Sequence, residues 1–206
     1  MNRALLRGDL INEVVNRVLD GRLPADTRVN EVHLAKELGV SRTPLREALI
    51  GLADRGLLLS SPGRGFLVPP LDPAEARQLY SLVAELEALA LRWSPMQDLM
   101  GLTDRLDEVA DEMTAALGVL GDQSELDDHW HAMLLSRTAN PHLLRLLAQT
   151  KPLLKRYDLL YFGGAERAAQ SIDEHRRIAA ALRVGDLTEA TRVLVQNWVK
   201  TSAYFG

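Results

Sequence analysis

The stretch "VPPLDPAEA", residues 68–76, divides the chain into two parts that must fold differently. Proline has no backbone N–H and a fixed φ, so two consecutive prolines end a strand and cannot continue it. The residues that follow predict the start of a helix, with Asp72 as the N-cap and Pro73 in the first helical position. The length of 206 residues suffices for two small domains. We therefore predict one domain over residues 1–70 and a second over residues 71–206.

The composition favours helices and a reducing compartment. Apolar residues make up 47% of the chain, aromatic residues only 5%, and cysteine is absent, which excludes disulfides and thiolate metal sites. No apolar segment has the length of a membrane span, and the N-terminus lacks the apolar core of a signal peptide, so we expect a cytoplasmic protein without a membrane partner. The net charge is −4, but the first domain has ten Lys and Arg against eight Asp and Glu. A mildly basic domain joined to an acidic one is compatible with local DNA binding.

The first domain has the pattern of a winged helix-turn-helix. Three segments with apolar residues at helical spacing, each followed by a glycine, predict helices over residues 5–19, 30–38 and 42–55. The segment "LLLSSPGRGFLV" then places two short apolar runs on either side of a turn rich in glycine, which predicts a β-hairpin.

The second domain is predicted to be an all-α antiparallel bundle, so the fold class is mainly α. Its helices are expected over residues 73–93, 99–118, 124–137, 141–162, 171–184 and 187–203. Capping-box patterns at Ser171 and Asp186 mark the starts of the last two helices. Pro152 is expected to kink or split the helix that contains it.

The segment "GVSRTPLREAL", residues 39–49, carries the side chains that could read DNA. Its glycine makes the turn, and Ser41 begins the next helix. The first turns of that helix present the candidate DNA-binding residues, which are Ser41, Arg42, Thr43 and Arg46. Recognition helices contact base edges with their N-terminal residues, and arginine can bind guanine bidentately.

The hairpin offers a second candidate contact to DNA. Gly63 and Arg64 lie at its tip, where an arginine could reach a phosphate or the minor groove. The alternative for all these residues is a surface helix with scattered arginines, which the combination of turn glycine, cap, paired arginines and wing disfavours.

The segment "LDDHWHAML", residues 126–134, raises the question of a metal site. Asp127 and His131 are four residues apart and share one helix face, which the apolar stripe turns toward the core. His175 and Asn197 lie on the inward stripes of two later helices, so the four side chains could converge. A carboxylate with imidazoles suits zinc, nickel or manganese. The alternative is that each inward polar group is satisfied by a hydrogen bond.

Residues 8–70 resemble the DNA-binding domain of the GntR family of bacterial transcription regulators. The resemblance rests on "GVSRTPLREALIGLADRGLL" followed by "GRGFLV". It implies binding to a short palindromic operator in double-stranded DNA, with contacts from Arg42, Thr43, Arg46, Gly63 and Arg64. Some relatives carry a DNA-contacting arginine where this chain has Val32, so that contact is expected to be missing.

Residues 73–203 resemble the FCD effector domain of the FadR subfamily, on the segments "LDDHWHAML", "ANPHLL" and "DEHRRIAAALRVGD". In metal-binding members, one aspartate and three histidines ligate an ion. The residues implied as ligands here are Asp127, His131 and His175. The fourth position falls on Asn197, a weaker donor, and Val83 stands where an arginine is expected.

The resemblance implies a homodimeric, ligand-responsive transcription regulator that binds a small organic acid. Arg156 and Tyr157 are the candidate residues for further contacts to that effector. Two other functions stay open from the sequence: a metal-dependent enzyme, for which no catalytic residue stands out, and a DNA-binding protein with a metal-free or vestigial pocket.

Overall fold

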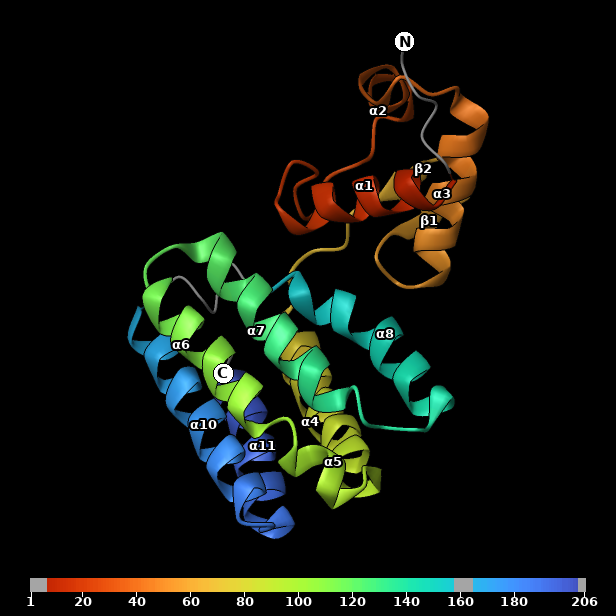
Figure 1. Ribbon diagram of the computed structural model, residues 1–206. Coiled ribbons are helices and arrows are strands. Elements are labelled where there is room, and N and C mark those ends of the chain that lie inside the picture. The colour runs from red at the N-terminus through yellow and green to blue at the C-terminus, as the bar shows by residue number, and fades with distance from the viewer. Residues whose placement is uncertain (1–6, 158–164, 204–206) are drawn as a thin grey trace. The chain divides into compact units, whose positions relative to one another are not determined.

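The computed structural model describes residues 7–157 and 165–203 and divides into two compact units after Asp72 (Figure 1). The front unit is a winged helix-turn-helix and the helical unit, from Pro73 onward, is all-α. The fold class predicted from the sequence is therefore confirmed. Among the described residues, no helix is both long and apolar enough to cross a bilayer.

The front unit packs two helices against a third. Its elements are α1 (Arg7–Leu19), α2 (Glu31–Leu38), α3 (Arg42–Asp54), β1 (Leu59–Ser61) and β2 (Gly65–Leu67). The side chain of Asn30 caps α2 by accepting a hydrogen bond from the backbone N–H of His33. Gly39 ends α2 with φ of 66°, a left-handed conformation that glycine adopts without strain. The turn between α2 and α3 is thus fixed at both ends.

The wing is a two-stranded antiparallel sheet. Leu59 pairs with Leu67 and Ser61 with Gly65, and Arg28 forms an additional bridge to Leu67. The turn between the strands contains Gly63 with φ of 72°. The bridge ties the wing to the segment that precedes α2.

The helical unit surrounds one apolar core. Its helices are α4 (Pro73–Trp93), α5 (Met96–Met100), α6 (Thr103–Ala115), α7 (Leu120–Leu135), α8 (Pro141–Lys155), α10 (Ala165–Arg183) and α11 (Leu187–Ser202). Helix α4 packs against α8 and α11, α10 packs against α6 and α11, and α7 packs against α6 and α4 (Figure 1). The arrangement places α4, α7, α10 and α11 around the residues of the candidate site.

The helix predicted over 99–118 is instead two helices, α5 and α6. The chain turns at Gly101, and the Thr103 hydroxyl donates a 2.9 Å hydrogen bond to the Met100 carbonyl at the end of α5. Leu99 and Leu102, on the two sides of the turn, are both buried. The turn at Gly101 and the Thr103 hydrogen bond to the end of α5 therefore interrupt the helix that the apolar periodicity predicted, although both leucines stay in the core.

A further detail of the prediction is wrong, and one of the two alternatives given for Pro152, a split helix, is excluded. Helix α10 begins at Ala165, so Ser171 lies inside it and caps nothing; its side chain faces α11 instead. Pro152 lies within α8 and does not split it, because the helix continues to Lys155. The end of the predicted 141–162 helix lies outside the described residues. Asp186 does cap α11, accepting from the N–H of Glu189.

Candidate functional site

The first turn of α3 presents a polar, exposed surface in the front unit. Arg42, Thr43 and Arg46 are exposed, whereas the opposite face of the helix buries Leu45 and Leu49. Ser41 occupies the N-cap position without a side-chain capping hydrogen bond. The sequence-predicted residues of α3 therefore lie together at one end of an exposed helix. A shallow groove is lined by Arg42, Thr43 and Arg46 together with Glu31, Glu47 and Ile50.

Arg46 is held by a residue that the sequence did not indicate. Its Nη1 donates to both carboxylate oxygens of Glu31, at 2.8 and 2.9 Å, and its guanidinium lies 5.7 Å from the ring centroid of Phe66. A Cβ on Gly65 would approach Glu31 Oε1 to 3.3 Å. The first turn of α2, α3 and the wing thus meet at the Glu31 carboxylate.

The wing tip exposes Arg64 beside Gly63. The Arg64 carbonyl accepts a 2.8 Å hydrogen bond from Arg28 Nη1, so the backbone at the tip is anchored while the Arg64 side chain extends into solvent. Val32 occupies the position where some relatives carry a DNA-contacting arginine, and its side chain is 61% exposed on α2.

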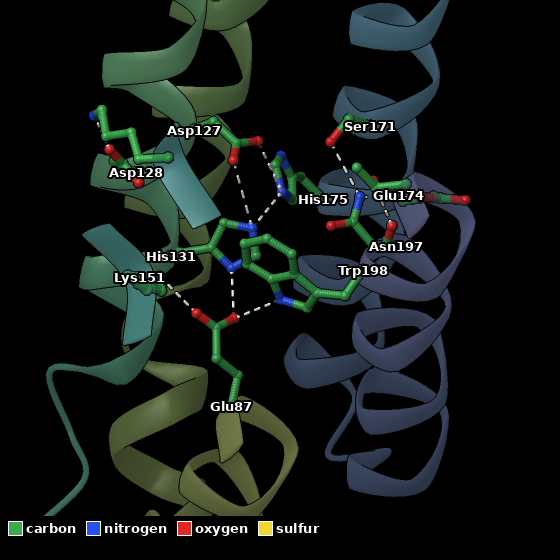
Figure 2. Close-up of polar contacts among 12 residues, drawn as sticks. Glu87, Asp127, Asp128, His131, Lys151, Ser171, Glu174, His175, Asn197 and Trp198 are labelled. Carbon is green, nitrogen blue, oxygen red and sulfur yellow. Dashed lines mark hydrogen bonds and ion pairs between the residues drawn. The ribbon is translucent and has the colours of Figure 1, made fainter. Parts of the chain in front are cut away.

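In the helical unit, Asp127 and His131 of α7 meet His175 of α10 (Figure 2). The Nε2 atoms of the two histidines are 3.2 Å apart. One Asp127 oxygen lies 3.8 Å from His131 Nε2 and the other lies 3.7 Å from His175 Nε2. All three side chains are buried, and one ligand atom from each lies within 4.8 Å of the others. This convergence is the one that the inward helix faces in the sequence made possible.

Glu87 of α4 contacts His131 and is fully buried. Its Oε2 accepts from His131 Nδ1 at 2.7 Å and from Trp198 Nε1 at 2.8 Å, and its Oε1 lies 2.6 Å from Lys151 Nζ (Figure 2). Burial opposes ionisation of this carboxyl, but the charges of His131 and Lys151 outweigh it and hold the pKa of Glu87 well below its usual range. The network is a buried, compensated charge cluster.

Glu87 also determines which nitrogen of His131 faces the cluster. Because Nδ1 donates to the carboxylate, Nε2 is the ring nitrogen that faces Asp127 and His175. Burial lowers the pKa of His175 well below its usual value, so that ring stays neutral, and it stacks on Trp130 with centroids 4.0 Å apart. Burial raises the pKa of Asp127 to about 6. At neutral pH, which lies above this value, Asp127 is still mostly ionised and gives the cluster its negative charge.

The donor set fits a divalent metal ion. Ligand atoms at about 2.0–2.2 Å from one ion lie about 3–3.5 Å from one another. The histidine pair already has this spacing, and the nearest Asp127 oxygens lie only slightly farther from the two rings, at 3.7 and 3.8 Å. A buried carboxylate with two inward imidazole nitrogens is a common ligand set for borderline divalent ions.

Asn197 of α11 adjoins the cluster but bonds elsewhere through its amide nitrogen. Nδ2 donates to Ser171 Oγ and to Glu174 Oε2, each at 3.0 Å. Asn197 and Asp127 line one small cavity, and its other lining residues are Tyr80, Asp128, Lys151, Leu154, Lys155, Ser171, Trp198 and Thr201. Ion pairs join Lys151 to Glu87 and Lys155 to Asp128 in this region.

The two candidate effector residues do not line that cavity. Arg156 and Tyr157 are both buried, and the Tyr157 hydroxyl donates a 2.5 Å hydrogen bond to Glu75 near the start of α4. Arg156 Nη1 lies 3.6 Å from the same carboxylate. Their contacts join α4 to the end of α8.

Glu87 was missed by the sequence analysis although its spacing carried a signal. It follows Tyr80 and Ala84 and precedes Leu91 on one stripe of α4, and all four are buried. A carboxylate on the buried stripe of a helix requires partners, so this spacing indicated a polar network, although it did not show which residues complete it.

Comparison with known proteins agrees with both units. Residues 6–68 match the bacterial regulatory proteins of the gntR family, and residues 78–198 match the FCD domain. The HTH-type transcriptional regulator YdhC of Bacillus subtilis (strain 168) is 30% identical over 172 residues, which are 81% of this chain and 76% of that protein. The Nta operon transcriptional regulator of Aminobacter aminovorans is 36% identical over 124 residues, 57% of each chain.

The solved structure of E. coli McbR/YncC has the same fold, with a TM-score of 0.74. The sequences are 23% identical, and the likeness covers 100% of this chain and 98% of that one.

The chain is a transcriptional regulator with an N-terminal helix-turn-helix domain and an FCD domain. It belongs to the GntR family of bacterial regulators. Regulators of this family bind DNA operators, and FCD domains bind small-molecule effectors. The family and its named relatives are regulators and not enzymes, so the metalloenzyme alternative is rejected.

Replacing Glu87 with alanine should destabilise the helical unit by about 3–5 kcal/mol, because the buried donors of His131 and Trp198 and the partly buried ammonium of Lys151 lose their shared acceptor. Glu85→Ala, which removes an exposed carboxylate from the same helix, should change stability by less than about 0.5 kcal/mol. Urea denaturation followed by circular dichroism measures both. Equal midpoints for the two variants would show that the Glu87 network contributes no net stability.

Proposed function

We propose that this regulator binds a short palindromic operator as a homodimer and that a small organic acid, held near a divalent metal ion in the helical unit, changes its affinity for DNA. In this proposal residues 1–70 bind DNA, and residues 71–206 bind the effector and dimerise. The observation that carries it is the buried cluster of Asp127, His131 and His175 beside a cavity that contains lysine side chains. Two identical recognition helices match the two halves of a palindrome, which favours a dimer.

The proposed DNA contacts come from α3 and the wing. Arg42, Thr43 and Arg46 would enter the major groove, where an arginine can pair bidentately with guanine. The ion pair with Glu31 would orient Arg46 before DNA arrives and so reduce the entropy lost on binding. Ser41 lies at the start of the same helix, where backbone N–H groups favour a phosphate. Gly63 and Arg64 would reach the backbone or the minor groove from the wing.

Arg42→Ala should weaken specific DNA binding by about 1–3 kcal/mol, because a base contact is lost. Arg55→Ala removes an exposed arginine from the other end of α3 and should leave affinity unchanged. The measurement is fluorescence anisotropy at fixed salt, on an operator selected from random DNA by the wild-type protein. Similar affinities for Arg42→Ala and wild type would remove Arg42 from the reading surface.

The proposed metal site consists of Asp127, His131 and His175, with Asn197 as a fourth, weaker donor. Zinc, nickel and manganese are the candidate ions. A bound ion would supply a Lewis-acidic position to which an effector carboxylate can bind, while the lysines at the cavity attract its negative charge. Asp127 contributes the anionic ligand, and Glu87 keeps the His131 lone pair directed inward.

Wild-type protein should retain one divalent ion per chain, and His131→Ala should lose it, because an imidazole ligand is removed. Asn197→His should hold the ion more tightly, since imidazole is a better donor to zinc or nickel than a carboxamide. His129→Ala, an exposed histidine on the same helix, is the matched control. Metal content is determined by mass spectrometry after dialysis against a mild chelator. Negligible metal in wild type and in Asn197→His alike would show that the cluster is only a hydrogen-bonded core.

A small carboxylate should change the DNA affinity of the metal-loaded protein by about fivefold or more, the lower end of common allosteric couplings. We expect Lys155→Met to diminish the response, because Lys155 lines the cavity, and Arg145→Met, on the exposed face of α8, to preserve it. The anisotropy assay is repeated with acetate, lactate, malate and citrate. Unchanged operator affinity with all four acids argues against a small carboxylate as the effector.

A further inference from the structure

Asn197 is buried between two acceptors that fix its amide group. Its Nδ2 donates to Ser171 Oγ and Glu174 Oε2 on α10, and Glu174 is itself 4% exposed. The other oxygen of Glu174 is ion-paired with Lys200, one turn beyond Asn197 on α11. A serine and a glutamate in the interior of α10 therefore converge on a single amide.

These partners allow only one orientation of the amide. A carboxylate is acceptor-only, so Glu174 requires the NH₂ side of Asn197 to face it. A flipped amide would place two oxygens about 3 Å apart in a buried setting, which carries a large desolvation and repulsion penalty. Lys200 pairs with the same carboxylate through its other oxygen.

The Asn197 oxygen is consequently turned away from Ser171 and Glu174. Figure 2 shows it on the side of His175. Asn197 lines the same cavity as Asp127, so a carbonyl oxygen faces the region of the candidate metal ligands. This oxygen is a hard, neutral donor at a corner where an imidazole would otherwise complete the set.

We propose that Ser171 and Glu174 are positioning residues that hold the Asn197 oxygen toward the Asp127, His131 and His175 cluster and thereby set which metal ion the site prefers. The inference rests on the proposed metal site. Imidazole favours zinc and nickel, whereas carbonyl and carboxylate oxygens suit manganese. A site with two oxygen and two nitrogen donors should therefore show a smaller preference in affinity for zinc over manganese than a site with three imidazoles.

The test uses the full-length protein and titrates manganese(II) and zinc(II) separately by calorimetry. Ser171→Ala/Glu174→Leu should raise the manganese Kd about tenfold or more, the usual effect of losing partners that orient a ligand. Glu174→Gln keeps an acceptor oxygen and should restore affinity close to wild type. Asp173→Leu removes an exposed carboxylate beside Glu174 and should have no effect. Asn197→His should raise the ratio of manganese Kd to zinc Kd about tenfold or more.

A double-mutant cycle separates positioning from general damage to the fold. In an Asn197→Ala background, Ser171→Ala/Glu174→Leu should change the manganese Kd by less than about twofold, because no amide remains to be oriented. A tenfold loss in that background as well would assign the two residues a merely structural role and overturn the inference.

A readout without metal distinguishes this inference from the metal proposal. In metal-free wild-type protein, the Asn197 side-chain NH₂ protons should exchange slowly with solvent in NMR spectra, and they should exchange rapidly in Ser171→Ala/Glu174→Leu. Fast exchange in wild type would overturn the positioning role even if metal binds. Slow exchange with no binding of either ion would instead refute the proposed metal site, and with it the assignment of Asn197 as a ligand.

Discussion

The helical unit depends on one buried carboxylate, that of Glu87. It lies in the centre of the bundle on α4 and joins α7 through His131, α8 through Lys151 and α11 through Trp198. An isolated buried charge would cost several kcal/mol, so the three partners are required for the fold as much as for the site. The same contacts orient the ring of His131, so that its Nε2 faces the cluster. The Glu87 carboxylate therefore contributes both to the stability of the bundle and to the chemistry of the site.

The sequence predicted the architecture because local signals agreed with burial over most of the chain. Gly39, Asn30 and the hairpin glycines specify the helix-turn-helix and its wing, and Asp186 marks the start of α11. The errors arose where tertiary contacts override local pattern. Ser171 has the spacing of a cap, yet its hydroxyl bonds to Asn197 on another helix, which no local pattern shows.

The candidate metal ligands could be predicted from the sequence, but the residues that support them could not. Asp127, His131 and His175 lie on inward helix faces, so periodicity alone brings them together. Their supporting residues depend on which helices become neighbours. Glu87 and Glu174 come from α4 and α10, and their partners are 44 and 23 residues away in sequence. Arg156 and Tyr157, predicted as effector contacts from their nearness to Pro152, do not line the cavity and contact Glu75 instead.

Buried polar groups of this kind make the packing of a helical bundle sensitive to a ligand in its cavity. An apolar core has many nearly equivalent packings, but a charge network with every partner in place has few, because any displaced group loses a hydrogen bond in a low-dielectric interior. The cavity borders on the Glu87 network at Lys151 of α8 and Trp198 of α11. A ligand that attracts Lys151 would compete with Glu87 for the same ammonium, and the loss would extend to His131 and Trp198 through the shared carboxylate. If the cavity holds the effector, as proposed, Glu87 would couple effector binding to helix packing, and a ligand could shift the packing only by as much as its affinity differs between the two arrangements.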